Sequence, residues 1–263
     1  MTITDQLLGP LLRADPARPR ITHYDDAAGS RVELSGTTLA NWAAKTANWL
    51  RDELDVQPGD TVAVMLPPHW QTAGALLGAW WCGATVINPP VGAPATHCGV
   101  AHCKVTLCEA EHIADVSGAD ELAALHLHAK GLQVMGTGTA TLPAGVRDFA
   151  SEIRVHGDTF LSSGPGLSGG PGPSNGPGPD AETVIKAARA RAAQLGLTAG
   201  DRLLCTTGWD ATVPGEVLLA VLAADASLVQ CTAADLAALP RRCAAERVTV
   251  TLGLEVPPLR RAG

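Results

Sequence analysis

The chain has 263 residues, 46% of them hydrophobic and 17% charged, with a formal net charge of −7. This composition favours a packed globular protein over a disordered or fibrous one. The negative charge, with no run of Lys or Arg longer than a pair, argues against nucleic acid or an acidic membrane surface as the main partner. No apolar run reaches the roughly 20 residues that span a bilayer. We expect no signal peptide, and the seven cysteines then indicate free thiols in the cytoplasm.

The first predicted helix covers residues 39–54, where apolar side chains recur at helical spacing. Thr37 or Thr38 is expected to cap its beginning, because a side-chain oxygen there can accept a hydrogen bond from an unpaired backbone amide. No earlier helix is expected.

An alternation of strands and helices follows this helix. Residues 58–60, Pro-Gly-Asp, predict a turn that leads into a buried aliphatic strand at 61–66. Residues 72–81 suit a buried helix, and 84–88 a second short strand. A strand is also expected at 105–108. Strands and helices that alternate in this way indicate an α/β fold.

The same unit is predicted to occur twice. Residues 54–60 resemble residues 195–201, an offset of 201 − 60 = 141 positions, and at this offset 83–84 match 224–225. A helix is expected before each turn, the second at 181–195. The sequence therefore predicts two similar α/β subdomains packed side by side.

A stretch rich in glycine and proline lies between the two units, at residues 164–179. Proline and glycine at this density form neither a helix nor a central strand. We therefore predict a first α/β subdomain at 1–161, a flexible or extended connector at 162–180, and a second α/β subdomain at 181–263.

Three motifs in chain order carry a family resemblance. They are VQPGDTVAVMLP at 56–67, GAWWCGATVINP at 78–89 and AERVTV at 245–250. With these motifs, residues 22–257 resemble the N-terminal part of the adenylate-forming (AMP-binding, acyl-CoA synthetase-like) enzymes, and more closely a group of short bacterial proteins of this kind. The resemblance implies two similar subdomains around a shared groove, with ATP or AMP and magnesium as ligands.

The stretch at 161–172 matches the family's phosphate-binding loop in position. It retains Ser162, Ser163 and Gly164, but lacks the threonines and the lysine, and Pro165 removes a backbone amide donor. A plain linker is the favoured interpretation, and a degraded loop that still binds an anion is the alternative. The resemblance also implies that the adenine-binding strand and the C-terminal lysine domain fall beyond Gly263. No catalytic residue is therefore carried over.

A cluster of metal-binding residue types offers another interpretation. His97, Cys98, His102, Cys103 and His112 lie within sixteen positions. On a helix, Cys98 and His102 would share one face at a spacing that suits zinc or another soft metal. The alternative is that the cysteines serve as small apolar residues where a helix leads into the strand at 105–108.

Three functional hypotheses remain at this stage. The favoured one is a non-catalytic relative of adenylate-forming enzymes with a binding or regulatory role. The second is one part of a split acid–thiol ligase that another chain completes, and the third is a metal-binding protein. A small acyl or nucleotide ligand, a protein partner and a homodimer are the expected partners.

Overall fold

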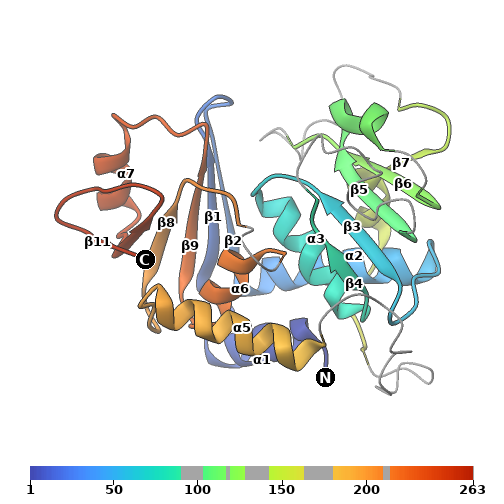
Figure 1. The fold of residues 1–263 in the computed structure, drawn as a ribbon, viewed down its shortest axis with the longest axis horizontal. Helices are drawn as coiled ribbons and strands as arrows, with labels where there is room; N and C mark the ends of the chain where they lie inside the picture. Colours follow the sequence, from blue (N-terminus) through green and yellow to red (C-terminus); the bar gives the residue numbers. More distant parts are fainter. Residues whose placement is uncertain (90–102, 117–118, 128–141, 163–179, 210–213, 263) are drawn as a thin grey trace.

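The computed structural model describes residues 1–89, 103–116, 119–127, 142–162, 180–209 and 214–262 as two sheets with helices between them (Figure 1). Sheet A has the order β11 (Arg260–Arg261), β10 (Val250–Leu252), β8 (Arg202–Cys205), β9 (Ser227–Thr232), β1 (Pro19–Asp25) and β2 (Ser30–Ser35). Sheet B has the order β4 (Thr85–Ile87), β3 (Thr61–Met65), β5 (Val105–Glu109), β6 (Glu121–Leu125) and β7 (Val146–Asp148). In these sheets, only β1 and β2 pair in antiparallel fashion. The α/β fold class expected from the sequence is confirmed.

The described helices differ in length and position. They are α1 (Ile3–Ala14), α2 (Gly36–Asp52), α3 (Trp70–Trp81), η3 (Ala110–Asp115), α4 (Phe149–Glu152), η4 (Ile153–Val155), α5 (Ala181–Gln194), α6 (Glu216–Ala223) and α7 (Leu239–Ala245). One apolar core runs from Ile21 and Leu228 of sheet A, through α1, α2, α3, α5 and α6, to Val62 and Leu107 of sheet B. Separate apolar clusters cover the other faces, with α7 on sheet A and η3 on sheet B.

Alternation along the strands of sheet A decides which side chains face the helices. Ile21 of β1 and Leu228 of β9 belong to the central core, whereas Tyr24 packs with α7 on the other face. Because successive side chains of a strand point to opposite faces, His23 lies on the same face as Ile21. It stands beside Gln230 in the parallel register of β1 and β9. A buried histidine therefore faces the space between the two sheets.

Helix α1 was not expected, and the structure corrects that omission. Thr2 accepts a hydrogen bond from the Asp5 amide, and the Asp5 side chain accepts one from the Thr2 amide, so a capping box starts the helix. Leu7, Leu8 and Leu11 are buried on one face. Proline normally interrupts a helix, and Pro10 inside this one obscures its periodicity.

Helix α2 starts before the position expected from the sequence. Its N-cap is Ser35, whose hydroxyl accepts the Thr38 amide, and not Thr37 or Thr38 themselves. The hydroxyl of Thr37 instead donates to the carbonyl oxygen of Pro16. The chain enters α2 directly from β2, so the tertiary position of that strand selects the cap.

The internal repeat is present in the structure at the level of single hydrogen bonds. Asp60 accepts the Gln57 amide as Asp201 accepts the Thr198 amide, both at 2.8 Å. The end of the unit is offset by one more residue than expected, because Gly83 (φ 82°) corresponds to Asp225 (φ 55°) and not to Ala224. The distance along the chain from Asp201 to Asp225 is therefore one position longer than that from Asp60 to Gly83 (24 against 23 positions).

The boundaries expected from the sequence do not separate the two sheets. Strands β1 and β2 belong to the first expected subdomain, 1–161, yet β1 pairs with β9 of the second. A hairpin near the beginning of the chain therefore completes a sheet built from its last third. The described parts of 162–180 are residue 162 and residue 180 alone, so the connector itself stays a prediction.

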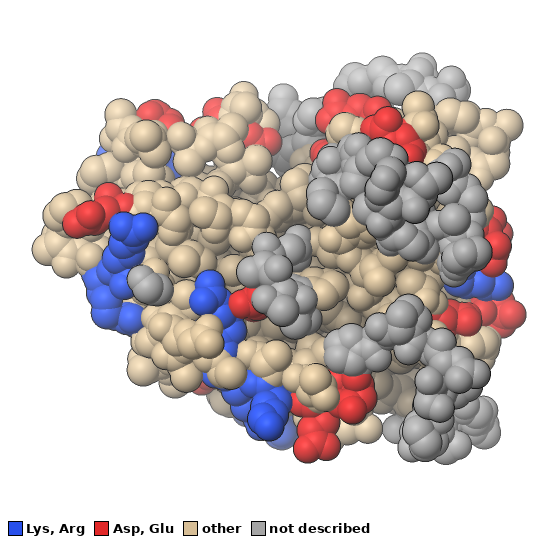
Figure 2. Space-filling model, viewed as in Figure 1, with Lys and Arg blue, Asp and Glu red and all other residues tan. Residues whose placement is uncertain are grey.

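Charge on the surface is mixed. On the face in Figure 2, Lys and Arg lie in separate groups among acidic side chains, and no single basic patch covers it. No helix in the described ranges has the length and apolar character needed to cross a membrane. That nucleic acid is not a partner stays a prediction.

Candidate functional site

The two sheets approach each other where β1, β9 and β3 end. The chain leaves β3 through Pro67-Pro68 and begins α3 at Trp70, with His69 as its N-cap. The hydroxyl of Thr232, at the end of β9, lies 3.5 Å from the Pro68 carbonyl oxygen. In parallel sheets, ligands bind in crevices outside the carboxyl ends of the strands. We call this region, comprising His23, Pro68, His69, Trp70, Gln71 and Thr232, the junction.

Two imidazole rings meet at the junction. His23 and His69 lie with their centroids 4.4 Å apart in an edge-to-face arrangement, and both are buried. His23 Nε2 lies 3.0 Å from Thr232 Oγ1. The Thr232 hydroxyl donates its single proton to the Pro68 carbonyl oxygen, so it can only accept from His23. We therefore assign the proton of the neutral His23 ring to Nε2, which leaves a lone pair on Nδ1.

Aromatic rings extend this contact away from sheet A. The His69 ring lies 5.3 Å from the Trp70 ring, and Trp70 packs edge-to-face on Trp42 of α2 at 4.9 Å. His69 Nδ1 also accepts the Gln71 amide, which satisfies one of the free donors in the first turn of α3. The imidazole thus caps the helix and joins sheet A to the helix layer.

A second polar contact lies beside the junction on sheet A. Trp209 is 2% exposed, and its indole donates to the Gln230 side chain at 2.7 Å. Gln230 in turn donates to the Thr207 carbonyl oxygen at 3.3 Å. The oxygen and the nitrogen of the Gln230 side-chain amide are thus both hydrogen-bonded within the protein, so this contact is structural.

Several polar atoms at the junction are buried without a partner. Among the residues that the structure describes, His23 Nδ1, Trp70 Nε1 and both polar atoms of the Gln71 side chain make no hydrogen bond. Buried groups of this kind are normally satisfied, by protein or by ordered water. Burial also lowers the pKa of His23 to about 4, although Asp25 opposes this shift. The junction therefore offers neutral donors and acceptors.

The position matched to the phosphate loop lies at the other end of α3. Ser162 donates to an Asp5 carboxylate oxygen at 2.9 Å, and Trp81 donates to the other oxygen at 2.8 Å. Trp81 ends α3, about 16 Å along the helix from Trp70. Burial raises the pKa of Asp5, but hydrogen bonds from Thr2, Trp81 and Ser162 outweigh it and lower the pKa. The Ser162 hydroxyl thus donates its hydrogen bond to the ionised Asp5 carboxylate and is not free to bind a phosphate. Ser163 and Gly164 lie outside the described residues.

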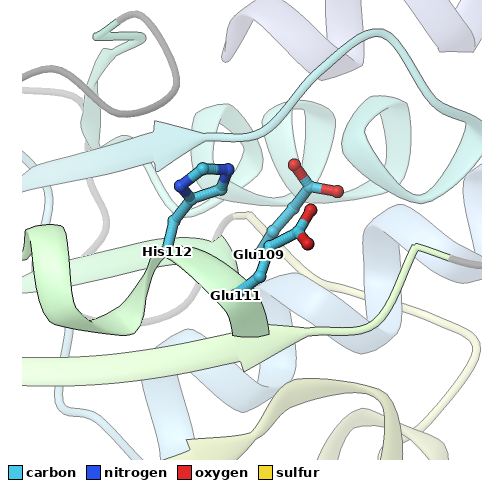
Figure 3. A group of neighbouring side chains, drawn as sticks. All are labelled: Glu109, Glu111 and His112. Carbon is cyan, nitrogen blue, oxygen red and sulfur yellow. The ribbon is translucent and has the colours of Figure 1, made fainter.

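The expected metal cluster is only partly within the described chain, since Cys98 and His102 fall outside it. Cys103 is buried in an apolar cluster, and burial raises the pKa of its thiol to about 11, which disfavours the thiolate that binds metal. His112 lies instead beside Glu109 and Glu111, with their ligand atoms within 4.8 Å (Figure 3). The His112 Nδ1 atom pairs with Asp115 at 2.9 Å. These groups are partly or fully exposed, so the metal site stays a prediction.

Comparison with known proteins places this geometry in a family. The AMP-binding enzyme family matches residues 13–139. A TIGR03089 family protein of Mycobacterium tuberculosis (strain ATCC 25618 / H37Rv) is 44% identical over 259 residues, which cover 95% of this chain and 98% of that protein. The chain belongs to the TIGR03089 family, and about half of it matches the AMP-binding enzyme family. The match covers nearly the whole of both proteins.

Solved structures show the same fold in longer proteins. The N-terminal domain of FACL13 from Mycobacterium tuberculosis matches with a TM-score of 0.70 and 15% identity, over 96% of this chain and 62% of that one. The Brucella canis acyl-CoA synthetase matches with a TM-score of 0.71 and 14% identity, over 96% of this chain and 47% of that one. This chain thus spans about half to two thirds of the length of these structures. Identities this low establish the fold alone.

The sequence did not indicate the junction as a site. His23 and His69 are 46 residues apart and share no motif with Thr232. The sequence around His23 is a mixed polar and apolar segment, and only the structure shows that residues 20–23 are all buried. Only the pairing of β1 with β9 shows that His23 faces His69.

Proposed function

We propose that this protein, a relative of the AMP-binding enzymes, has a binding or regulatory role and does not complete adenylation by itself. The observation that carries the proposal is the hydrogen bond from Ser162 to the charged Asp5. Adenylation concentrates negative charge on phosphate and pyrophosphate, so its loop must supply donors and positive charge. The Asp5 carboxylate, which lies against Ser162 at the start of the matched stretch, would instead repel a phosphate group. The stretch also contains no lysine.

The family and the junction support a proposal for the class of ligand. The matched structures include an acyl-CoA synthetase and an anthranilate CoA ligase in complex with anthranoyl-AMP. We propose that the present chain keeps a site for a related acyl, aromatic or nucleotide group near the junction. The unpartnered atoms of Trp70 and Gln71 support this, because a ligand or water must satisfy them. Six described cysteines are buried free thiols, which supports a cytoplasmic location.

A pyrophosphate-exchange assay tests the absence of adenylation. The purified protein is incubated with ATP, magnesium, labelled pyrophosphate and a panel of fatty and aromatic acids, with a full-length acyl-CoA synthetase as positive control. We expect no exchange above the protein-free blank. Exchange catalysed by this chain alone would refute the proposal.

Thermal unfolding with ATP, AMP, CoA and an acyl-adenylate analogue tests ligand binding separately. A ligand that binds only the folded state at 100 times its Kd stabilises it by about 2.7 kcal/mol. A rise in Tm that disappears in Gln71→Ala would support a site near the junction. A rise that Gln71→Ala and Trp70→Phe both retain would place the site elsewhere.

A split ligase remains the second candidate, and one observation favours it. The structural match includes 96% of this chain but only 47% of the Brucella canis synthetase. A complete enzyme of that type would therefore need a further segment. Co-purification from the native cell followed by mass spectrometry tests this idea. A stable partner that restores exchange supports it, whereas a homodimer or monomer without activity counts against it.

A further inference from the structure

The contact between the two sheets at the junction contains a buried imidazole ring. His23 is 1% exposed, and the only hydrogen bond of its side chain to a described residue joins Nε2 and Thr232. Thr232 links onward to the Pro68 carbonyl oxygen, immediately before His69. One hydroxyl therefore connects the end of β9, the side chain of β1 and the segment that leads into α3.

Protonation would take place at a defined atom. Nε2 already carries the proton of the neutral ring, so a second proton must bind at Nδ1. Nδ1 is buried and has no acceptor among the described residues. A charged N–H group enclosed in this way loses its hydration without gaining a partner, which is strongly unfavourable.

The surroundings offer little compensation for such a charge. Asp25, on the same strand, is the carboxylate that favours protonation, and its effect is smaller than that of burial. The partners of His23 in register are Val32 on β2 and Gln230 on β9, neither of which titrates. His69, from the beginning of α3, is the other titratable group facing it, and a second imidazole cannot neutralise a positive charge.

We propose that protonation of His23 releases the beginning of α3 from β1 and β9, so that the junction is an acid-sensitive contact between the two sheets. The neutral ring holds the contact closed, and the charged ring is stable only when water reaches Nδ1. The proposal does not depend on nucleotide binding or on the adenylation test. It concerns a conformational property of the junction itself.

The sign of the pH effect follows from the two protonation states. The pKa of His23 is about 4 in the folded protein and about 6.5 when the ring is solvated. The open form therefore binds more protons between these values, and the closed form is fully favoured only above about pH 6.5. From pH 7 to pH 5 the equilibrium constant for opening rises about 20-fold.

The first test is hydrogen exchange at pH 7 and pH 5, corrected for intrinsic rates, on the wild type, His23→Gln and the control His156→Gln. Gln can keep the hydrogen bond to Thr232 but cannot titrate, whereas His156 is half-exposed and lies away from the junction sequence. We expect residues 19–25 and 66–74 to lose protection at pH 5 in the wild type and the control, but not in His23→Gln. Equal loss in all three proteins would overturn the proposal.

A second measurement needs only the wild type, in case His23→Gln does not fold. Carbon-13 labelling of histidine reports the titration of His23 by NMR, and the indole signal of Trp70 reports the start of α3. We expect His23 to titrate well below 6.5 and the Trp70 signal to change with it. Titration of His23 near 6.5, or a Trp70 signal that does not follow it, would overturn the proposal.

Discussion

Single residues join segments that are far apart in this chain. Glu246 is 8% exposed, and it accepts hydrogen bonds from Tyr24, Arg31 and Arg202. These bonds join the end of α7 to three strands of sheet A. Burial raises the pKa of Glu246, but the hydrogen bonds from Arg31 and Tyr24 outweigh it and lower the pKa to about 2.

Replacing Glu246 by Gln should destabilise the fold by about 2 kcal/mol, because the partly buried guanidinium of Arg202 loses the nearer of its two carboxylate partners. Chemical unfolding at pH 7 measures this. The Glu246 carboxylate stabilises the wild type fully above its unfolded pKa of about 4.5, and this contribution is lost as the pH falls towards 2. Glu246→Gln should lack this acid-dependent loss. Glu255→Gln, at an exposed position, serves as the control, and equal stability of the two variants would contradict the assignment.

Asp5 tests the electrostatic argument at the matched loop. Asp5→Asn retains the size of the side chain and removes its charge beside Ser162. We expect the affinity for ATP with magnesium to rise about fivefold, as removal of one partly screened charge permits. Isothermal titration calorimetry measures the change, and the exposed Asp120→Asn is the control for net charge. An affinity that Asp5→Asn leaves unchanged would show that Asp5 does not oppose phosphate binding.

At the scale of elements, the close approach of α2 and α3 depends on glycine. A Cβ atom added at Gly78 would lie 2.5 Å from Thr46 Cβ and 2.8 Å from the Ala43 carbonyl oxygen. The two helices therefore touch backbone to backbone, which positions Trp70 against Trp42. The helix period of the sequence predicts both helices, but it does not show which face carries this contact.

Gly78→Ala should therefore lower the free energy of unfolding by about 2 kcal/mol, since overpacking exceeds the gain in helix propensity. Gly9→Ala in α1 is a matched control, because its nearest neighbour is the flexible end of Arg13 at 3.3 Å. That variant should stabilise the protein by up to about 1 kcal/mol. Thermal unfolding measures both, and equal effects of the two variants would contradict the packing argument.

At the scale of the whole molecule, the chain crosses between its two halves. The hairpin of β1 and β2 completes sheet A although it ends at Ser35, 167 positions before the next strand of that sheet begins at Arg202 (202 − 35 = 167). Without the hairpin, β9 would become an exposed edge strand with its core face uncovered. Neither half therefore carries a complete sheet A.

The fragment 181–263 should not fold on its own. We expect it to show little ordered structure by circular dichroism and NMR, and to fold when produced together with fragment 1–180. The physical reason is the loss of β1, which pairs with β9 over Ile21–Asp25 and buries Ile21 completely. A folded monomer of 181–263 would contradict this prediction and support the domain boundary expected from the sequence.

The sequence by itself determined the α/β class, the family and the principal helices and strands of the repeated unit. Helical periodicity, the Pro-Gly-Asp turn and short aliphatic strands are local signals, and local geometry fixes them. The sequence did not determine the position of β1 and β2 in sheet A, the residue at which α2 starts, the existence of α1 or the junction. These depend on the pairing of β1 with β9 and on the packing of α3 against sheet A, which unite segments about 200 residues apart. Tertiary structure alone decided that His23 faces His69.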